Sequence, residues 1–210
     1  MIDDYFATLE DWKQLPAYKL ETKIDSLVGF ALSSVMEHIY GIATQALIPE
    51  LPIRLGTIHL EYEDTELANR SDKVDFYIRT AQGENYFVEF KSDSKSRRES
   101  QDDYLRRAID VGMGGILEGI LAISKVSPYR KKYAHLLSKL KLAGLLDATG
   151  SVQDIDERIQ LMYVQPHRLQ GDDPRLVLDF PHLAQAIRAC FPSSDFMSRF
   201  SSSLETWAKD

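Results

Sequence analysis

Hydrophobic residues recur at helical spacing along residues 18–40, and this periodicity predicts an amphipathic helix there. Shorter runs rich in β-branched and aromatic residues predict strands at residues 53–62, 74–78, 86–91 and 158–165. Further helical patterns cover residues 99–123, 128–146, 181–191 and 194–209. Because helices and strands alternate along the chain, we expect an α/β fold.

The charged residues of two predicted neighbouring strands are the most informative polar positions. Residues 74–78 and 86–91 are joined by a polar turn, and side chains on a strand alternate between its two faces. Glu89 and Lys91 therefore share one face, and Asp75 likewise opposes its apolar neighbours. Pairing the strands would bring two carboxylates and an ammonium together where burial makes charge costly, which points to a metal ion. The alternative is an exposed hairpin on which Glu89 and Lys91 form a solvated polar stripe.

The spacing from Asp75 to the Glu-x-Lys sequence at residues 89–91 resembles the PD-(D/E)xK nucleases, the restriction-endonuclease-like superfamily. Val74 stands where the family name has proline. The predicted order over residues 18–165 is helix, three strands, helix, strand, which is also the core order of that superfamily. The resemblance implies a restriction-endonuclease-like core, a central mixed sheet flanked by helices, with extra C-terminal helices.

The resemblance also implies a function, that of a metal-dependent nuclease hydrolysing phosphodiester bonds. DNA is expected rather than RNA because the family mostly uses DNA. Mg²⁺ or Mn²⁺ would be held by Asp75, Glu89 and the backbone carbonyl of Phe90, leaving positions for water. Lys91 would orient or deprotonate the attacking water, or stabilise the charge that develops on the phosphate.

Family members often carry a further carboxylate on the first helix. Of Glu21, Asp25 and Glu37, only Glu21 falls inside the apolar stripe, so we expect it to be the fourth catalytic residue. Its alternative role is to stabilise the helix dipole from the first turn. A glutamine followed by a tyrosine on the second helix marks the RecB-like branch, and Gln101 and Tyr104 are the candidates here. The alternative is a polar helix start with one half-buried tyrosine.

Charge is distributed unevenly along the chain. The formal net charge is −7, which argues against nonspecific coating of nucleic acid. Residues 91–150 nevertheless hold 12 Lys and Arg against 7 Asp and Glu, whereas residues 1–90 hold 7 against 16. We expect nucleic acid to contact eight residues: Lys95, Arg97, Arg98, Gln101, Tyr104, Arg130, Lys131 and Lys132. The alternative for each basic cluster is a solvated helix face.

The remaining composition limits the class of protein. We expect a single domain over residues 1–210, with residues 125–150 and 180–210 as helical additions to the core. The lone Cys190 excludes an internal disulfide and suits the cytoplasm, and no signal peptide or membrane span is evident. The five histidines lack zinc spacing, and the glycines at 112–115 lie in a helical pattern, where they would allow close helix packing.

The expected binding partners are inferred from the lack of a recognisable DNA-recognition module in the sequence. No helix-turn-helix or zinc module is evident, so target recognition would come from a homodimer or from a partner protein. The rival hypothesis is a catalytically inactive binding or assembly subunit of a larger nucleic-acid-processing or defence complex. The presence of Asp75, Glu89 and Lys91 favours the enzyme.

Overall fold

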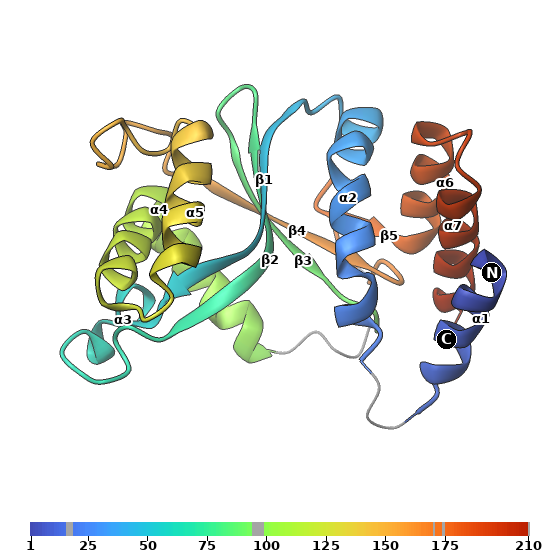
Figure 1. The fold of residues 1–210 in the computed structure, drawn as a ribbon, viewed down its shortest axis with the longest axis horizontal. Coiled ribbons are helices and arrows are strands. Elements are labelled where there is room, and N and C mark those ends of the chain that lie inside the picture. The colour runs from blue at the N-terminus through green and yellow to red at the C-terminus, as the bar shows by residue number, and fades with distance from the viewer. Residues whose placement is uncertain (16–18, 94–98, 170, 174, 210) are drawn as a thin grey trace. The chain divides into compact units, whose positions relative to one another are not determined.

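The computed structural model describes residues 1–15, 19–93, 99–169, 171–173 and 175–209, and leaves out the side chains of residues 99–101. The chain is an α/β protein with a five-stranded mixed sheet, ordered β1-β2-β3-β4-β5 and flanked by helices (Figure 1). The strands are β1 (Thr44–Arg54), β2 (Ser71–Thr80), β3 (Asn85–Phe90), β4 (Ile159–Gln165) and β5 (Val177–Asp179). The helices are α1 (Ile2–Trp12), α2 (Glu21–Tyr40), α3 (Leu55–Ile58), α4 (Glu99–Val126), α5 (Arg130–Leu142), α6 (Phe180–Cys190) and α7 (Asp195–Trp207), with a 3-10 turn at Leu60–Tyr62. No helix among the described residues is long and apolar enough to cross a membrane.

The chain packs as two compact units. The first unit comprises Met1–Thr44, Glu89–Arg97 and Met162–Asp210, and the second comprises Gln45–Val88 and Arg98–Leu161. Strands β3 and β4 each contribute residues to both units.

The β2–β3 hairpin that the sequence predicted belongs to the second unit up to Val88. The strands pair antiparallel with Phe76 opposite Val88 and Tyr77 opposite Phe87, and the turn closes through the Thr80 N–H, which donates to the Glu84 carbonyl at 3.0 Å. Phe76, Tyr77, Phe87 and Val88 are all buried, although successive residues point to opposite faces. The hairpin is therefore covered on both faces.

Helix α4 and the strands of the second unit share one hydrophobic core. Its members come from β1, β2, β3, α4 and α5 and include Ile53, Tyr77, Phe87, Leu117 and Leu140. Helix α3 packs against α4, and Figure 1 shows α5 beside α4. Gly119 permits the close contact with α3, because a Cβ there would lie 2.4 Å from the Thr57 hydroxyl.

Helix α4 is interrupted in its middle. Gly112 has φ 79° and ψ 167°, a conformation that only glycine adopts readily. Beyond this break the Met113 N–H donates to the Glu157 carbonyl at 3.0 Å, and the Gly114 N–H donates to Glu157 Oε2 at 2.6 Å. Glu157 thus satisfies backbone donors that a helix start leaves unpaired. Gly112 and Gly114, which were expected to permit helix packing, instead accommodate Glu157.

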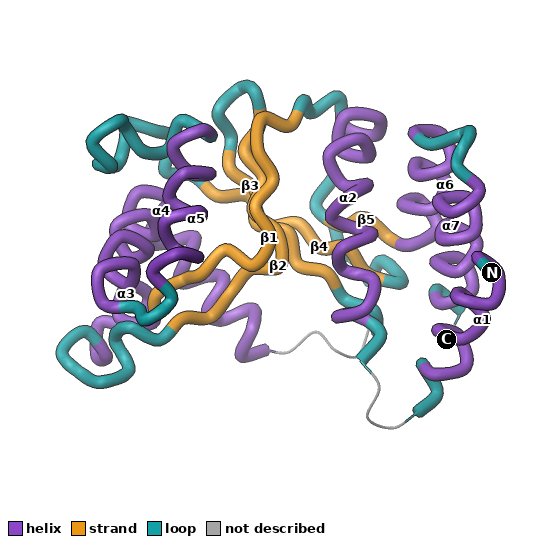
Figure 2. The backbone as a smooth tube through the Cα atoms, in the orientation of Figure 1, coloured by secondary structure: helices purple, strands orange, loops and turns teal. Residues whose placement is uncertain are grey.

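The first unit is mainly helical. Helix α2 confirms the predicted 18–40 helix and buries Ile24, Val28 and Leu32. It packs on α6, α6 packs on α7, and α7 packs on α1 (Figure 2). Strands β4 and β5 pair in parallel, and Asp179 at the end of β5 caps α6 by accepting the His182 N–H at 3.0 Å.

One predicted strand is wrong in position. Residues 53–62 were expected to be extended, but β1 ends at Arg54 and a helical turn and a 3-10 turn follow. The true strand contains Pro49 and Pro52, which lack the N–H that a ladder needs and so mask a strand in the sequence. β1 is first in the strand order, and an edge strand tolerates proline.

Candidate functional site

A buried ion pair lies at the end of β3, within the first unit. Glu89 Oε2 is 3.0 Å from Lys91 Nζ, and the exposed fractions of the two side chains are 0% and 5%. The two share a face because they are two residues apart on extended backbone. The Lys91 N–H donates to the Val164 carbonyl of β4 at 2.8 Å, which fixes this segment. A solvated polar stripe is therefore the wrong description of Glu89 and Lys91.

A buried ion pair contributes little net free energy to folding. Each charge loses its hydration on burial, and the attraction between them offsets that loss only in part, so apolar residues of similar volume are often as stable. Buried charge pairs are common at functional sites, where charge is needed for binding or chemistry. The position of Glu89 and Lys91 therefore calls for a functional explanation.

Glu21 lies near the same strand end. It is the first residue of α2, and its Oε2 accepts a long hydrogen bond from the Ser92 N–H at 3.4 Å. Among the other candidate helix carboxylates, Asp25 accepts from the adjacent Ser26 N–H, and Glu37 is exposed near the far end of the helix. The choice of Glu21 agrees with this geometry, and its catalytic role stays a prediction.

Two of the predicted metal ligands occupy different surroundings. Phe90 is fully buried, and its ring stacks on Phe180 with centroids 6.0 Å apart. Asp75 is half-buried in β2 and belongs to the second unit, where it directly precedes Phe76. The first unit thus holds Glu21, Glu89, Phe90 and Lys91.

The donors named from the sequence fit a hard divalent ion. Carboxylate oxygens of Asp75 and Glu89 and a backbone carbonyl are ligands that Mg²⁺ and Mn²⁺ prefer, and Mg²⁺ is often held by one or two carboxylates with water and phosphate. Within the described residues, no three His, Cys, Asp or Glu side chains form a group that could hold a metal. The metal site stays a prediction.

The predicted nucleic-acid contacts are only partly described. Arg130, Lys131 and Lys132 form the first turn of α5 and are exposed. Tyr104 is half-buried, and its hydroxyl donates to the Lys73 carbonyl at 2.9 Å, which ties α4 to β2. The remaining contacts lie outside the described residues: Lys95, Arg97, Arg98 and the side chain of Gln101.

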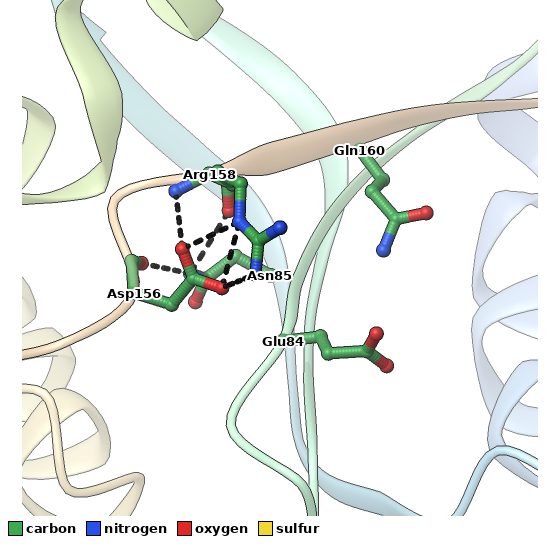
Figure 3. Close-up of a pocket in the computed structure, with 5 residues that line it drawn as sticks. All are labelled: Glu84, Asn85, Asp156, Arg158 and Gln160. Atoms are coloured by element: carbon green, nitrogen blue, oxygen red, sulfur yellow. Dashed lines mark hydrogen bonds and ion pairs between the residues drawn. The ribbon is translucent and has the colours of Figure 1, made fainter.

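A second polar site, which the sequence did not indicate, lies at the start of β3 in the second unit (Figure 3). This pocket of about 240 Å³ is lined by Glu84, Asn85, Asp156, Arg158 and Gln160. Figure 3 shows the Arg158 guanidinium facing the Asp156 carboxylate, with the Glu84 and Gln160 side chains on the other side. The volume is below the roughly 300–1,000 Å³ of small-molecule sites, so only a small polar group would fit.

Asn85 organises the floor of this pocket. Its Oδ1 accepts hydrogen bonds from the Tyr77 hydroxyl at 2.7 Å and from Arg79 Nη1 at 3.0 Å. Its Nδ2 donates to the carbonyls of Asp156 at 2.7 Å and Arg158 at 3.2 Å. Every donor and acceptor of the amide is thus used. Burial also raises the pKa of the Tyr77 hydroxyl, which keeps it a donor.

The acidic side of the pocket is held by a local ion pair. Arg158 Nη2 lies 2.7 Å from Asp156 Oδ2. Hydrogen bonds from the Arg158 side chain, and then from its backbone N–H, lower the pKa of the Asp156 carboxyl to about 2. Both residues are therefore charged at neutral pH, and the charges of the pair cancel.

Comparison with known proteins gave no match: no family model, curated protein or solved structure is significantly similar to the chain. What the chain does must therefore be argued from its own residues.

Proposed function

We propose that this protein is a metal-dependent nuclease that hydrolyses phosphodiester bonds, with DNA as the expected substrate. The supporting observation is the buried Glu89–Lys91 ion pair at the end of β3, with the Glu21 carboxylate near the same strand end. The PD-(D/E)xK pattern requires an acidic and a basic side chain at this spacing. Because the two side chains are buried, they support a functional site more strongly than a solvated pair would.

A bound Mg²⁺ would supply a Lewis acid and a water of lowered pKa. Asp75, Glu89 and the Phe90 carbonyl would hold it, and Glu21 would add negative charge beside it. Lys91 is a cationic side chain ion-paired with Glu89 at 3.0 Å. Of the roles open to Lys91, we therefore favour holding the phosphate and stabilising the charge that develops on it.

The test is cleavage of linear DNA in Mg²⁺ by wild type, Lys91→Met and Glu89→Gln. Both variants keep the side-chain volume and should lose cleavage, because each removes a charge that the reaction uses. DNA affinity measured in EDTA should stay nearly intact for Lys91→Met, since losing one phosphate contact changes the salt slope by about one at most. Lys73→Met, which removes an exposed lysine of the same hairpin, is the matched control and should cleave normally.

Mn²⁺ titration calorimetry separates binding from catalysis. Wild type and Lys91→Met should bind Mn²⁺, whereas Glu89→Gln should bind it much more weakly. Equal cleavage by wild type and Lys91→Met would indicate a contaminating nuclease and contradict the proposal. DNA binding without either Mn²⁺ binding or cleavage would instead identify a non-catalytic binding subunit.

A further inference from the structure

Helix α5 presents a cationic surface with an aromatic residue at its start. Arg130, Lys131, Lys132 and Lys139 are exposed along the helix, and Tyr129 immediately before it is 64% exposed. Lys132 Nζ lies 5.5 Å from the centroid of the Tyr129 ring, within the range of a cation–π contact. We call Tyr129, Arg130, Lys131 and Lys132 the Tyr129 surface.

The basic side chains of this surface have no acidic neighbours nearby in the sequence. No acidic residue occurs between Gly119 and Leu146. Among the described residues, Arg130, Lys131 and Lys132 take part in none of the ion pairs, whereas three arginines of the first unit each pair with a carboxylate: Arg168, Arg175 and Arg188. In a chain with a net charge of −7, an unpaired cationic patch is a site where a polyanion can bind.

The apolar side of α5 is already covered. Leu140 is fully buried, and Leu136 and Leu137 pack partly buried against the core of the second unit. The exposed apolar residues lie singly beyond or at the helix ends, at Val126 and Leu142, and form no stripe. An amphipathic helix that binds a bilayer needs a free apolar face, so the surface chemistry favours a soluble polyanion over a lipid surface.

We propose that the Tyr129 surface binds single-stranded nucleic acid, with a base stacked on Tyr129 and phosphates at Arg130, Lys131 and Lys132. The choice of nucleic acid rests on the proposed nuclease function. The choice of a single strand rests on Tyr129: bases in a duplex stack on one another, whereas the bases of a single strand are free to stack on an aromatic side chain. Basic residues around an exposed aromatic ring are the usual composition of such a platform.

The test measures affinity in EDTA, so that cleavage plays no part. A fluorescent thymidine oligonucleotide and a duplex of the same length are titrated with wild type and variants over a range of salt concentrations. Tyr129→Ala should weaken single-strand binding about tenfold, the value of one stacked base, and leave the salt dependence unchanged. Tyr129→Phe should bind as wild type does, because the ring is kept. Phe30→Ala, which removes another exposed aromatic ring at 68% exposure, should have no effect.

The charged part of the surface is tested with Arg130→Gln, Lys131→Gln and Lys132→Gln combined. This variant should lower the slope of log affinity against log salt by about two, because each single-strand phosphate contact contributes about 0.7. An unchanged slope, or an equal loss of single-strand and duplex affinity in Tyr129→Ala, would overturn the proposal. Binding to phosphatidylserine vesicles in place of the oligonucleotide would also overturn it and assign a lipid surface.

The outcomes separate this inference from the proposed function. Cleavage by wild type combined with an inert Tyr129→Ala substitution contradicts the Tyr129 surface alone. Single-strand binding that requires Tyr129, in a protein that neither binds Mn²⁺ nor cleaves, contradicts the nuclease proposal alone.

Discussion

The two ends of β3 place polar side chains in the interior in different ways. At its start, Asn85 is a neutral amide whose four hydrogen-bonding positions are all occupied by Tyr77, Arg79 and two backbone carbonyls. At its end, Glu89 and Lys91 form a charged pair with almost no exposure. A saturated amide stabilises a fold, whereas a buried charge pair does so weakly.

The contrast indicates which buried polar groups suggest a function. Asn85 joins segments about 71–73 residues apart, from β3 to the carbonyls of Asp156 and Arg158, and this structural role accounts for all of its contacts. Glu89 and Lys91 instead form an ion pair at 3.0 Å, and a buried ion pair is weak evidence of a stabilising role. Polarity alone would rank the two sites equally, and the contrast is why the proposed chemistry is placed at the charged end.

The largest expected effect is on the neutral end. Asn85→Ala removes the partners of a buried hydroxyl, a buried guanidinium and two carbonyls, so the free energy of unfolding should fall by about 3 kcal/mol or more. Urea denaturation measures this change. Asn69→Ala is the matched control: Asn69 also accepts from an arginine, Arg54, at 3.0 Å but is exposed, and its loss should cost about 0.5 kcal/mol or less. Similar losses in the two variants would contradict the structural role of Asn85.

The sequence predicted those helices and strands whose residue pattern is local and extends over several turns or positions. Helix α2 was predicted because its periodicity runs over many turns, and the β2–β3 hairpin because its strands are rich in β-branched and aromatic residues. Strand β1 was misplaced, and the two prolines within it, Pro49 and Pro52, lack the N–H that a strand ladder uses. Strand β5 was missed because it is only three residues long, and helix α1 was missed although it is amphipathic and buries Phe6 and Leu9.

The same reasoning applies to the polar sites. Glu89 and Lys91 could be chosen because their spacing is local and charge is unusual on a strand. The role of Asn85 could not be predicted, because its partners are carbonyls far along the chain and any residue has a carbonyl. Arg79, which follows the apolar run of residues 76–78 in β2, was the one available signal. It is only 9% exposed, and its Nε has no hydrogen-bond partner among the described residues.

A smaller effect is expected where Glu157 anchors the loop that carries Asp156 and Arg158. Gly112→Ala would strain the backbone at φ 79° and place a Cβ 2.7 Å from Glu157 Oε2, so it should cost about 2 kcal/mol. Gly144→Ala is the control: φ there is 68° with nothing within 4 Å of the new Cβ, and only about 1 kcal/mol of conformational strain is expected. Thermal unfolding of both variants provides the comparison. A Gly112→Ala protein as stable as wild type would show that α4 can close its break and that Glu157 is not needed there.

The charged end should tolerate removal of both charges. In Glu89→Leu combined with Lys91→Met, we expect the free energy of unfolding to stay within about 1 kcal/mol of wild type, while DNA cleavage is abolished. Lys91→Met alone leaves the Glu89 carboxylate buried without its ammonium, so it should be the less stable protein, by about 3 kcal/mol. Urea denaturation at neutral pH measures both. If the double variant is instead as unstable as Asn85→Ala, the ion pair is structural and the contrast between the two ends of β3 disappears.

The smallest effect concerns the exposed Asp156–Arg158 pair beside the pocket. The pKa of Asp156 is lowered to about 2 in the folded protein, against about 3.9 for an unperturbed aspartate. Its stabilising contribution is therefore fully present above about pH 4 and is lost as the pH falls towards 2. The stability difference between wild type and Asp156→Asn should be constant from neutral pH down to about pH 4 and should shrink below it.

Asp173→Asn is a matched control, since Asp173 forms the same local pair with Arg175 at 2.9 Å and its pKa is also lowered by that arginine. The charge of the buried Arg79 also lowers the pKa of Asp156, so the stability effect of Asp156→Asn should depend more strongly on pH than that of Asp173→Asn. Equal pH profiles for the two variants would show that the Asn85 network does not extend to the Asp156 carboxylate.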